Sequence, residues 1–354
     1  MNEDCLKLTS YFGERQRTAA DGFVADALLD LYGRQGVATS ILLRGAEGFG
    51  AGQRLRTDRS ESLSNDLPLT AVAVDTRSRI EGLLDPTAGL LRSGLVTLER
   101  ARLLTGDLET GAAGGATDAE TKLTVYVGRQ ERVYRVPAFV AVCDLLHRRG
   151  IAGATALLGV DGTAHGERER AAFFSRNAGT PMMVIAVGAG AQIARVLPEL
   201  GGLLRQPLLT LERVTICKRD GELLCQPPPA SEFRTADDGT DQRPAYKLMV
   251  YTSEGALHDG QPIHRAIVGR LRAAGISGAT TQRGMWGFHG DHVPHGDRLL
   301  QLGRHVPAVT IVIDAPERIR AAFAIIDDLT AEQGLVTCEM VPVTRQQHPA
   351  GQRV

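Results

Sequence analysis

The chain has 354 residues, of which 43% are hydrophobic and 23% are charged, and its formal net charge is −1. A single hydrophobic core rarely grows beyond roughly 250–300 residues, so this length predicts two or three domains. The net charge is near zero and the basic residues form no blocks. The sequence therefore gives no electrostatic reason to expect binding to nucleic acid or to an anionic membrane surface.

One set of landmarks recurs three times along the chain. It opens with a Lys-Leu-x-x-Tyr pattern at Lys7–Tyr11, Lys122–Tyr126 and Lys247–Tyr251. It closes with a motif of the Leu-Val-Thr-Leu-Glu type. Six landmarks keep the same order in all three copies, which indicates tandem repeats. The closing motif occupies Leu95–Glu99, Leu208–Glu212 and Leu335–Glu339.

Each repeat begins with a predicted strand and a predicted helix. The opening motif alternates polar and apolar residues, as a half-buried strand does. Apolar residues then follow at i, i+4 and i+8, such as Val24, Leu28 and Tyr32, and predict one face of a helix. In every copy a glycine stands at the left-handed position that ends a helix. These glycines are Gly36, Gly150 and Gly275.

The second half of each repeat contains a strand, a long glycine-rich loop, a third strand, a helix and a final strand. The second helix is expected to start near Asp75, Gly188 or Asp314. The order β-α-β-β-α-β places two helices on one face of a four-stranded antiparallel sheet. We therefore predict an α+β protein of three tandem ferredoxin-like domains.

The repeats also set the expected domain boundaries. Composition changes abruptly between copies, and the intervening segments lack periodicity, so we interpret them as linkers. The expected order is repeat 1 at 1–104, a linker at 105–121, repeat 2 at 122–218, a linker at 219–245, repeat 3 at 246–345 and a flexible tail at 346–354.

Two of the glycine-rich loops begin with an arginine and could hold an anion. Backbone N–H groups of glycines can approach an anion closely, and an arginine can hold a phosphate or a carboxylate with two hydrogen bonds. The alternative is that the glycines only allow the chain to turn away from the strand. The candidates are Arg44, Gly45, Gly48 and Gly50 in repeat 1, and Arg283, Gly284, Gly287 and Gly290 in repeat 3.

The loop of repeat 3 is also a weaker candidate for a metal site. Imidazole and carboxylate groups this close in sequence could bind zinc or copper. Their spacing matches no defined zinc motif, so a solvated loop is the favoured interpretation. The residues are His289, Asp291, His292 and His295.

Other patterns give little support to a cofactor or to catalysis. Met183–Leu197 contains a strand, Gly-x-Gly and a helix, as in a dinucleotide site. Ile193, however, stands where a third small residue is needed, and the other repeats lack these glycines. No nucleophile–base–acid set is evident, so we predict no catalytic residues.

The tyrosine of the opening motif has two interpretations. Tyr11, Tyr126 and Tyr251 fit packing on a sheet face or in a core. Alternatively, they stack on the base of a ligand in a cleft. The first interpretation is favoured.

Three features bear on location. The acidic N-terminal segment lacks the apolar core of a signal peptide. The longest uncharged stretch, 179–194, is shorter than a membrane-spanning helix. The five cysteines include no C-x-x-C pair, which favours free thiols. We expect a cytoplasmic protein.

Together these motifs resemble a known family. The Lys-Leu-x-x-Tyr pattern, the stretch Arg44–Gly50, the Asp-Leu-Pro of Asp66–Pro68 and the closing motif are similar to the domain-of-unknown-function family 190, which is grouped by fold with PII-like proteins. The resemblance covers nearly all of the chain outside the linkers. Repeat 2 departs from it, because Leu158 replaces the arginine and Thr163 replaces the aromatic residue.

The resemblance implies an assembly and a type of ligand. PII-like proteins are homotrimers whose sheets face inward, and their ligands, often adenine nucleotides, bind in clefts between subunits under the long loop. Three linked copies therefore imply a pseudo-trimer within one chain. The phosphate-binding stretch of true PII proteins is missing before the last strand, so other anionic metabolites are open alternatives and no cofactor is firmly predicted.

The resulting expectation is a non-enzymatic regulatory or sensor protein. It would bind a small anionic ligand in clefts between repeats and signal through its long loops to a partner protein such as a transporter or an enzyme. The alternatives are a ligand-free scaffold module and a metal-binding protein that uses the histidine loop of repeat 3. Repeat 2, without the arginine, is expected to bind weakly or not at all through its own loop.

Overall fold

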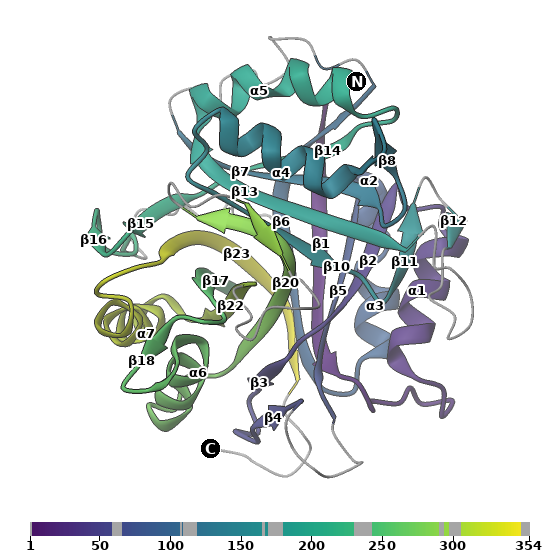
Figure 1. Cartoon of the computed structure of the whole chain (residues 1–354). Helices are drawn as coiled ribbons and strands as arrows, with labels where there is room; N and C mark the ends of the chain where they lie inside the picture. The colour runs from purple at the N-terminus through teal and green to yellow at the C-terminus, as the bar shows by residue number, and fades with distance from the viewer. Residues whose placement is uncertain are drawn as a thin grey trace.

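The computed structural model describes residues 2–58, 66–106, 108, 119–164, 167–168, 180–229, 243–289, 294–296 and 306–347. Three similar units follow one another along the chain and close into a ring, and most of their strands join one large antiparallel sheet (Figure 1). The helices of the three units lie at three separate corners of the molecule (Figure 1). The predicted α+β class and the three repeats are confirmed.

Repeat 1 follows the predicted order of strands and helices. Its elements are β1 (Asn2–Gly13), α1 (Val24–Arg34), β2 (Thr39–Arg44), β3 (Glu47–Phe49), β4 (Arg56–Thr57), β5 (Pro68–Thr76), α2 (Arg77–Glu81), α3 (Leu84–Leu90) and β6 (Gly94–Thr105). The long strands pair antiparallel in the order β2-β5-β1-β6. The second helix is split, because Gly82 ends α2 and Pro86 suits only the first turn of α3.

Repeats 2 and 3 have the same strand order, β10-β13-β7-β14 and β20-β22-β17-β23. Repeat 2 contains β7 (Glu120–Gly128), β8 (Arg132–Val133), β9 (Val136–Pro137), α4 (Ala138–Arg148), β10 (Gly153–Leu158), β11 (Asp161–Ala164), β12 (Glu167–Arg168), β13 (Pro181–Ala189), α5 (Gly190–Leu203) and β14 (Leu208–Arg213). Repeat 3 contains β17 (Arg243–Ser253), β18 (Leu257–His258), β19 (Gln261–Pro262), α6 (Ile263–Ala273), β20 (Ala279–His289), β21 (His295–Gly296), β22 (Pro307–Asp314), α7 (Pro316–Leu329) and β23 (Leu335–Gln347).

The helices form where the apolar periodicity predicts them. In α1 the residues Val24, Leu28 and Tyr32 are fully buried. The chain leaves the helix through Gly36, whose φ of 58° is a conformation that glycine adopts readily. The longest described helices, α5 and α7, have 14 residues each, and no described helix is long and apolar enough to cross a membrane.

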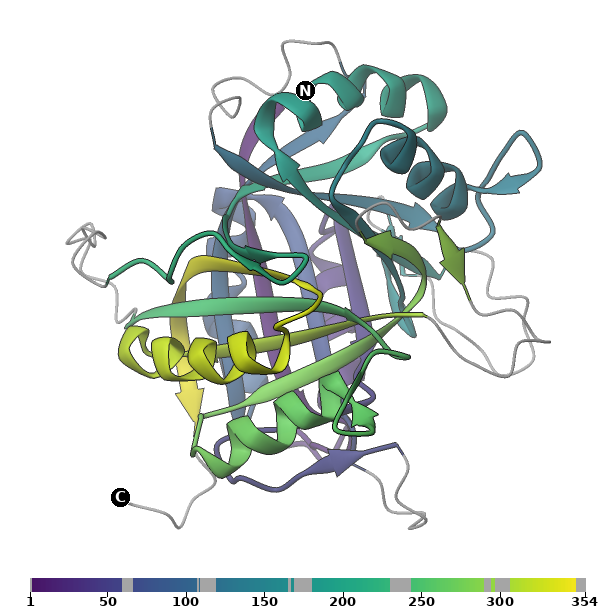
Figure 2. The same cartoon turned by 60° about the vertical axis from the view of Figure 1, so that its left-hand side comes forward.

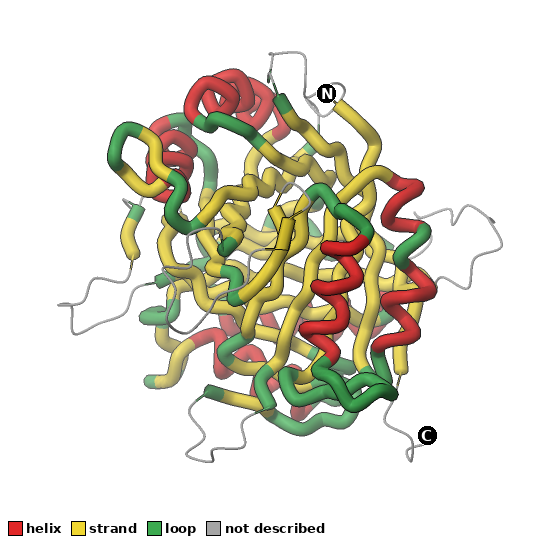
Figure 3. Tube along the Cα trace, turned by 90° about the vertical axis from the view of Figure 1, so that its right-hand side faces the viewer, coloured by secondary structure: helices red, strands yellow, loops and turns green. Residues whose placement is uncertain are grey.

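The hydrophobic residues form three outer clusters and one central cluster. Each outer cluster lies between the sheet of one repeat and its helices. The central cluster receives side chains from all three repeats, for example Val72, Ile185 and Ile311. Helices therefore cover the outer sheet faces, and the inner faces meet one another, so that the strands lie inside the helices (Figure 3).

The ring closes because the last strand of each repeat runs on beside the next repeat. The end of β6 pairs with the start of β14, and the end of β23 pairs with the start of β6. After β14 the chain continues as β15 (Thr215–Arg219), which pairs with the start of β23. The last strand of every repeat thus pairs with strands of both neighbouring repeats, and fewer sheet edges remain unpaired.

The glycine-rich loops supply a second set of pairings between repeats. β3 pairs with β20, β11 pairs with β2, and the outer half of β20 pairs with β10. The loop of each repeat thus contacts the preceding repeat of the ring, whereas the last strand of each repeat contacts the following one. Every interface between repeats is therefore held by two strand pairings. Figure 2 shows that the strands lie in the centre of the molecule and the helices around them.

Part of the segment expected as the second linker is regular structure. β15 and β16 (Glu222–Leu223) form a hairpin on the edge of repeat 3, and β17 already begins at Arg243. Pairing with β23 explains why this segment is regular. A strand without apolar periodicity can still be held by backbone hydrogen bonds.

Candidate functional site

A cavity of about 360 Å³ lies between repeats 1 and 3, a volume typical of small-molecule sites. Repeat 1 contributes the end of β1, the start of β6 and the segment after β3, and repeat 3 contributes β20 and β22. The walls are mainly apolar and partly aromatic. They include Tyr11, Phe12, Phe49, Ile311 and Ile313. We call this cavity the 1–3 cleft.

Two arginines give the 1–3 cleft a positive side. Arg56 is paired with Asp66 at 2.9 Å. Arg54 is exposed and makes no hydrogen bond or ion pair with any residue that the structure describes. Gly50 and Gly52 lie beside them, and a Cβ built on either glycine would meet no atom within 4 Å. The Arg54 guanidinium group thus has no partner among the described residues.

An equivalent cavity of about 470 Å³ lies between repeats 2 and 1. Its residues Tyr126, Pro181 and Leu208 occupy the positions of Tyr11, Pro68 and Leu95 in the 1–3 cleft. Repeat 1 contributes Thr39 from the start of β2. We call this cavity the 2–1 cleft. The tyrosine of the opening motif thus packs on the sheet face and also lines a cleft in two repeats.

The arginines that open the loops are engaged elsewhere. Arg44 pairs with Glu14 at 2.8 Å and does not line the 1–3 cleft. Arg283 pairs in the same way with Glu254 at 2.8 Å, and it also pairs with Asp58 from repeat 1. In repeat 2 both positions of this pair differ, with Leu158 for the arginine and Arg129 for the glutamate.

Two of the candidate glycines allow the backbones of neighbouring repeats to approach each other. A Cβ on Gly48 would lie 2.5 Å from the carbonyl oxygen of Ala279, and one on Gly287 would lie 2.2 Å from that of Ala154. Real Cβ atoms do not approach this closely, so β3 and β20 need glycine at these positions. Gly45 and Gly284 are crowded in another way, because a Cβ there would lie 2.7 Å from the ring of Pro68 and 2.9 Å from the methyl group of Thr155. Of the candidate set, only Gly50 lines the 1–3 cleft, and Gly290 lies outside the described residues.

The structure gives a partial view of the histidine loop. His289 is half-buried at the end of β20, and His295 belongs to β21. Asp291 and His292 lie outside the described residues. Within the described part of the chain, one group of three side chains has the spacing of metal ligands, namely Glu99, Glu212 and Glu339.

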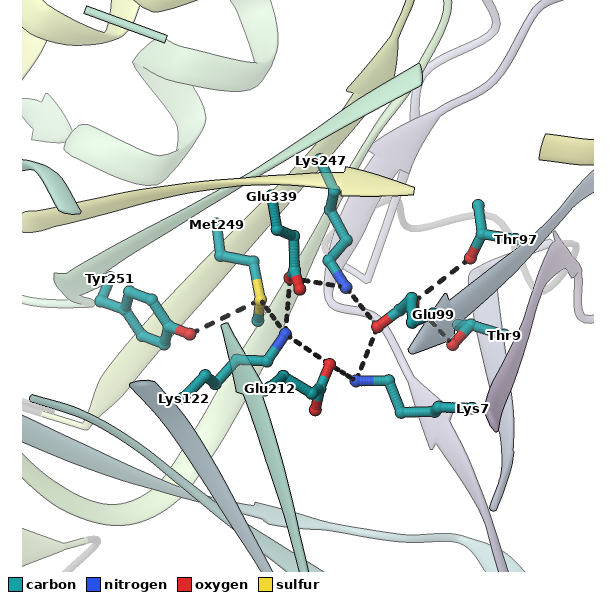
Figure 4. A network of polar contacts seen from close by, with 10 residues as sticks. All are labelled: Lys7, Thr9, Thr97, Glu99, Lys122, Glu212, Lys247, Met249, Tyr251 and Glu339. Atoms are coloured by element: carbon teal, nitrogen blue, oxygen red, sulfur yellow. Dashed lines mark hydrogen bonds and ion pairs between the residues drawn. The ribbon is translucent and has the colours of Figure 1, made fainter. Parts of the chain in front are cut away.

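These three glutamates belong to a closed ring of alternating charges in the centre of the molecule (Figure 4). Every lysine of the ring bridges the glutamate of its own repeat and that of one neighbour, with N–O distances of 2.5 to 2.9 Å. The side chains are at most 9% exposed. Three lysines neutralise three carboxylates, so the glutamates need no metal ion. The charge ring consists of Lys7, Glu212, Lys122, Glu339, Lys247 and Glu99.

The surroundings of the charge ring stabilise its charged form. Desolvation by burial opposes ionisation, but the neighbouring glutamates outweigh it and hold the pKa of Lys7 well above its usual range. Burial likewise opposes ionisation of Glu99, and the three lysines hold its pKa well below the ordinary value. Glu99 also accepts hydrogen bonds from the hydroxyl groups of Thr9 at 3.1 Å and Thr97 at 3.3 Å.

The lowered pKa of Glu99 and of Glu339 predicts acid sensitivity. A carboxyl group whose pKa is lower in the folded than in the unfolded state stabilises the fold at pH values above its unfolded-state pKa, near 4.5. This stabilisation is lost as the pH falls through the folded-state pKa. We expect the free energy of unfolding to drop steeply below about pH 4.5. Urea titrations across this pH range should show a shallower drop for Glu99→Gln. Equal pH dependence in both proteins would contradict the charge ring as the cause.

The composition of the sequence contains a signal for the charge ring. The chain has only four lysines among its 40 basic residues, and three of them occupy the same position in the three repeats. A rare residue type at a repeated position on a strand is unlike a solvated surface charge. The ring also explains Glu212, which lies at the acidic position of the rejected dinucleotide pattern and is 3% exposed.

Comparison with known proteins identifies relatives of each repeat. The model of the family DUF190, described as "Uncharacterized ACR, COG1993", matches residues 5–103, 120–216 and 245–343. A "UPF0166 protein" of Aquifex aeolicus (strain VF5) is 29% identical over 97 residues, which are 27% of this chain and 90% of the relative. That relative is therefore about as long as one repeat. Neither description states an activity.

Proposed function

Because this chain belongs to the domain-of-unknown-function family 190 in all three of its repeats, we propose that it is a PII-like sensor protein. It binds a small anionic ligand in the 1–3 cleft and reports the bound state to a partner protein in the cytoplasm, such as a transporter or an enzyme. Two observations support a PII-like pseudo-trimer. Each repeat has the ferredoxin-like order of elements, and the three inner sheet faces share one apolar cluster.

The observation that carries the proposal is Arg54 in the lining of an apolar and aromatic cavity. A guanidinium group without a described partner can form charge-assisted hydrogen bonds with a phosphate or a carboxylate. Tyr11, Phe12 and Phe49 offer surfaces for a flat apolar group. This combination suits a ligand with a planar body and an anionic end, and adenine nucleotides are one such class.

The lining of the 1–3 cleft also favours binding over catalysis. Its described residues include no carboxylate, imidazole or thiol that could serve as a general base or a nucleophile. Arginine, glycine and aromatic residues bind and orient a ligand without reacting with it. We therefore propose a non-enzymatic site.

Replacing Arg54 with alanine should weaken ligand binding in the 1–3 cleft by roughly tenfold or more, because a hydrogen bond to a charged group is lost. Isothermal titration with adenine nucleotides and other anionic metabolites measures the change. Arg44→Ala is the matched control, since Arg44 pairs with Glu14 and does not line the cleft. If no such ligand binds the wild-type protein, the ligand-free scaffold takes the place of the sensor.

A further inference from the structure

The 2–1 cleft differs in charge from the 1–3 cleft although the two occupy equivalent positions. In the 1–3 cleft, Gln16 is a neutral wall residue whose amide donates a hydrogen bond to the carbonyl oxygen of Ser93 at 2.9 Å. In the 2–1 cleft, the equivalent residue is Glu131. Arg205 lines the same cavity, next to Gln206, which stands at the position of Ser93.

Glu131 and Arg205 are opposite charges that do not neutralise each other. One carboxylate oxygen of Glu131 accepts a hydrogen bond from the backbone N–H of Gly128 at 3.1 Å. Within the described ranges of the chain, neither Glu131 nor Arg205 forms an ion pair. A carboxylate and a guanidinium group therefore face one cavity, each without a charged partner among the described residues.

We propose that the 2–1 cleft is a second binding site, for a small zwitterion of the α-amino acid type. The ligand's carboxylate pairs with Arg205, and its ammonium group pairs with Glu131. Val127, Pro181 and Leu208 provide an apolar wall for an aliphatic side chain. A purely anionic ligand is disfavoured here because it would approach Glu131.

This site is independent of the proposed ligand of the 1–3 cleft. The charges of the 1–3 cleft come from Arg54 and Arg56, and its described lining has no acid to hold an ammonium group. One chain would then bind two ligands of different charge at equivalent positions of its ring.

Calorimetric titration of the full chain with L-leucine, N-acetyl-L-leucine and L-leucinamide tests the assignment. The two derivatives each lack one of the charges. We expect leucine, or another aliphatic amino acid, to bind with a stoichiometry of one, and the matching derivatives to bind at least about tenfold more weakly. If none of the standard amino acids binds, or if both derivatives bind as well as the parent amino acid, the proposal is wrong.

Two substitutions locate the binding site. In Glu131→Gln, N-acetyl-L-leucine should bind as well as leucine does. In Arg205→Gln, L-leucinamide should bind as well as leucine does. Both side chains are partly or fully exposed, so the melting temperature should change little. Arg54→Ala is the control and should leave amino acid binding unchanged. If amino acid binding is lost in Arg54→Ala but kept in both other variants, the ligand lies in the 1–3 cleft and the proposal is wrong. This outcome does not depend on whether an anion binds in the 1–3 cleft.

Discussion

Replacing Lys122 with methionine is expected to lower the free energy of unfolding by about 3–5 kcal/mol. The substitution keeps an unbranched apolar side chain that is one atom shorter, and it removes one positive charge from the charge ring. Glu212 and Glu339 would each lose one of their two lysine partners, and both are at most 6% exposed on their side chains. A buried carboxylate that loses its partner cannot recover the lost hydration. Chemical denaturation with urea measures the change.

The exposed ion pair between Arg149 and Glu199 provides the control. Its N–O distance of 2.7 Å resembles those in the charge ring, but its side chains are 55% and 36% exposed. Glu199→Gln should therefore cost much less stability than Lys122→Met. A loss in Lys122→Met no larger than in this control would show that burial does not amplify the contacts of the ring.

Gly162→Ala is expected to destabilise the protein by about 3 kcal/mol through the interface between repeats 2 and 1. The added methyl group would lie 2.3 Å from the carbonyl oxygen of Ser40 and 2.4 Å from the ring of Pro181. The carbonyl belongs to β2, which is paired with β11 on this side and with β5 on the other, so it cannot move away freely. Thermal unfolding should show a lower midpoint.

A second glycine separates crowding from the general effect of adding a methyl group. Gly269 lies on the exposed side of α6, and a Cβ there would meet nothing within 4 Å. Gly269→Ala should raise stability by about 0.5–1 kcal/mol, because alanine favours the helix. Opposite signs for the two substitutions support the interpretation, whereas a neutral Gly162→Ala would mean that the repeats separate enough to admit a side chain.

Periodicity and repetition were sufficient to predict the elements of each repeat. Apolar spacing located α1, α4 and α6, and the glycines that follow them have φ values of 58°, 70° and 71°. The start of each second helix was predicted within two residues, at Arg77, Gly190 and Pro316. These features depend on local interactions, which a sequence displays directly. The split between α2 and α3 was missed, although Gly82 and Pro86 signal it.

The contacts between repeats were harder to predict, because they depend on which segments meet. The glycines of the loops were recognised, but a requirement for close approach looks the same in a sequence as a requirement for anion binding. Arg44 and Arg54 show the same difficulty. Both are arginines near glycines, and only the fold shows that one pairs with Glu14 while the other lines a cleft. The charge ring is not evident from the motifs, because its lysines and glutamates also mark the start and the end of each repeat.

The distribution of the four lysines has a consequence for the chemistry of the whole protein. Three lie in the charge ring, and Lys218, whose side chain is 3% exposed, pairs with Asp327. The surface cations are therefore arginines, which acylating reagents do not modify. In the native state, amine-specific labels and cross-linkers should react only at the α-amino group. Labelling of the three ring lysines would then begin only when the ring opens, so their acylation, measured by mass spectrometry, reports directly on unfolding of the centre of the molecule.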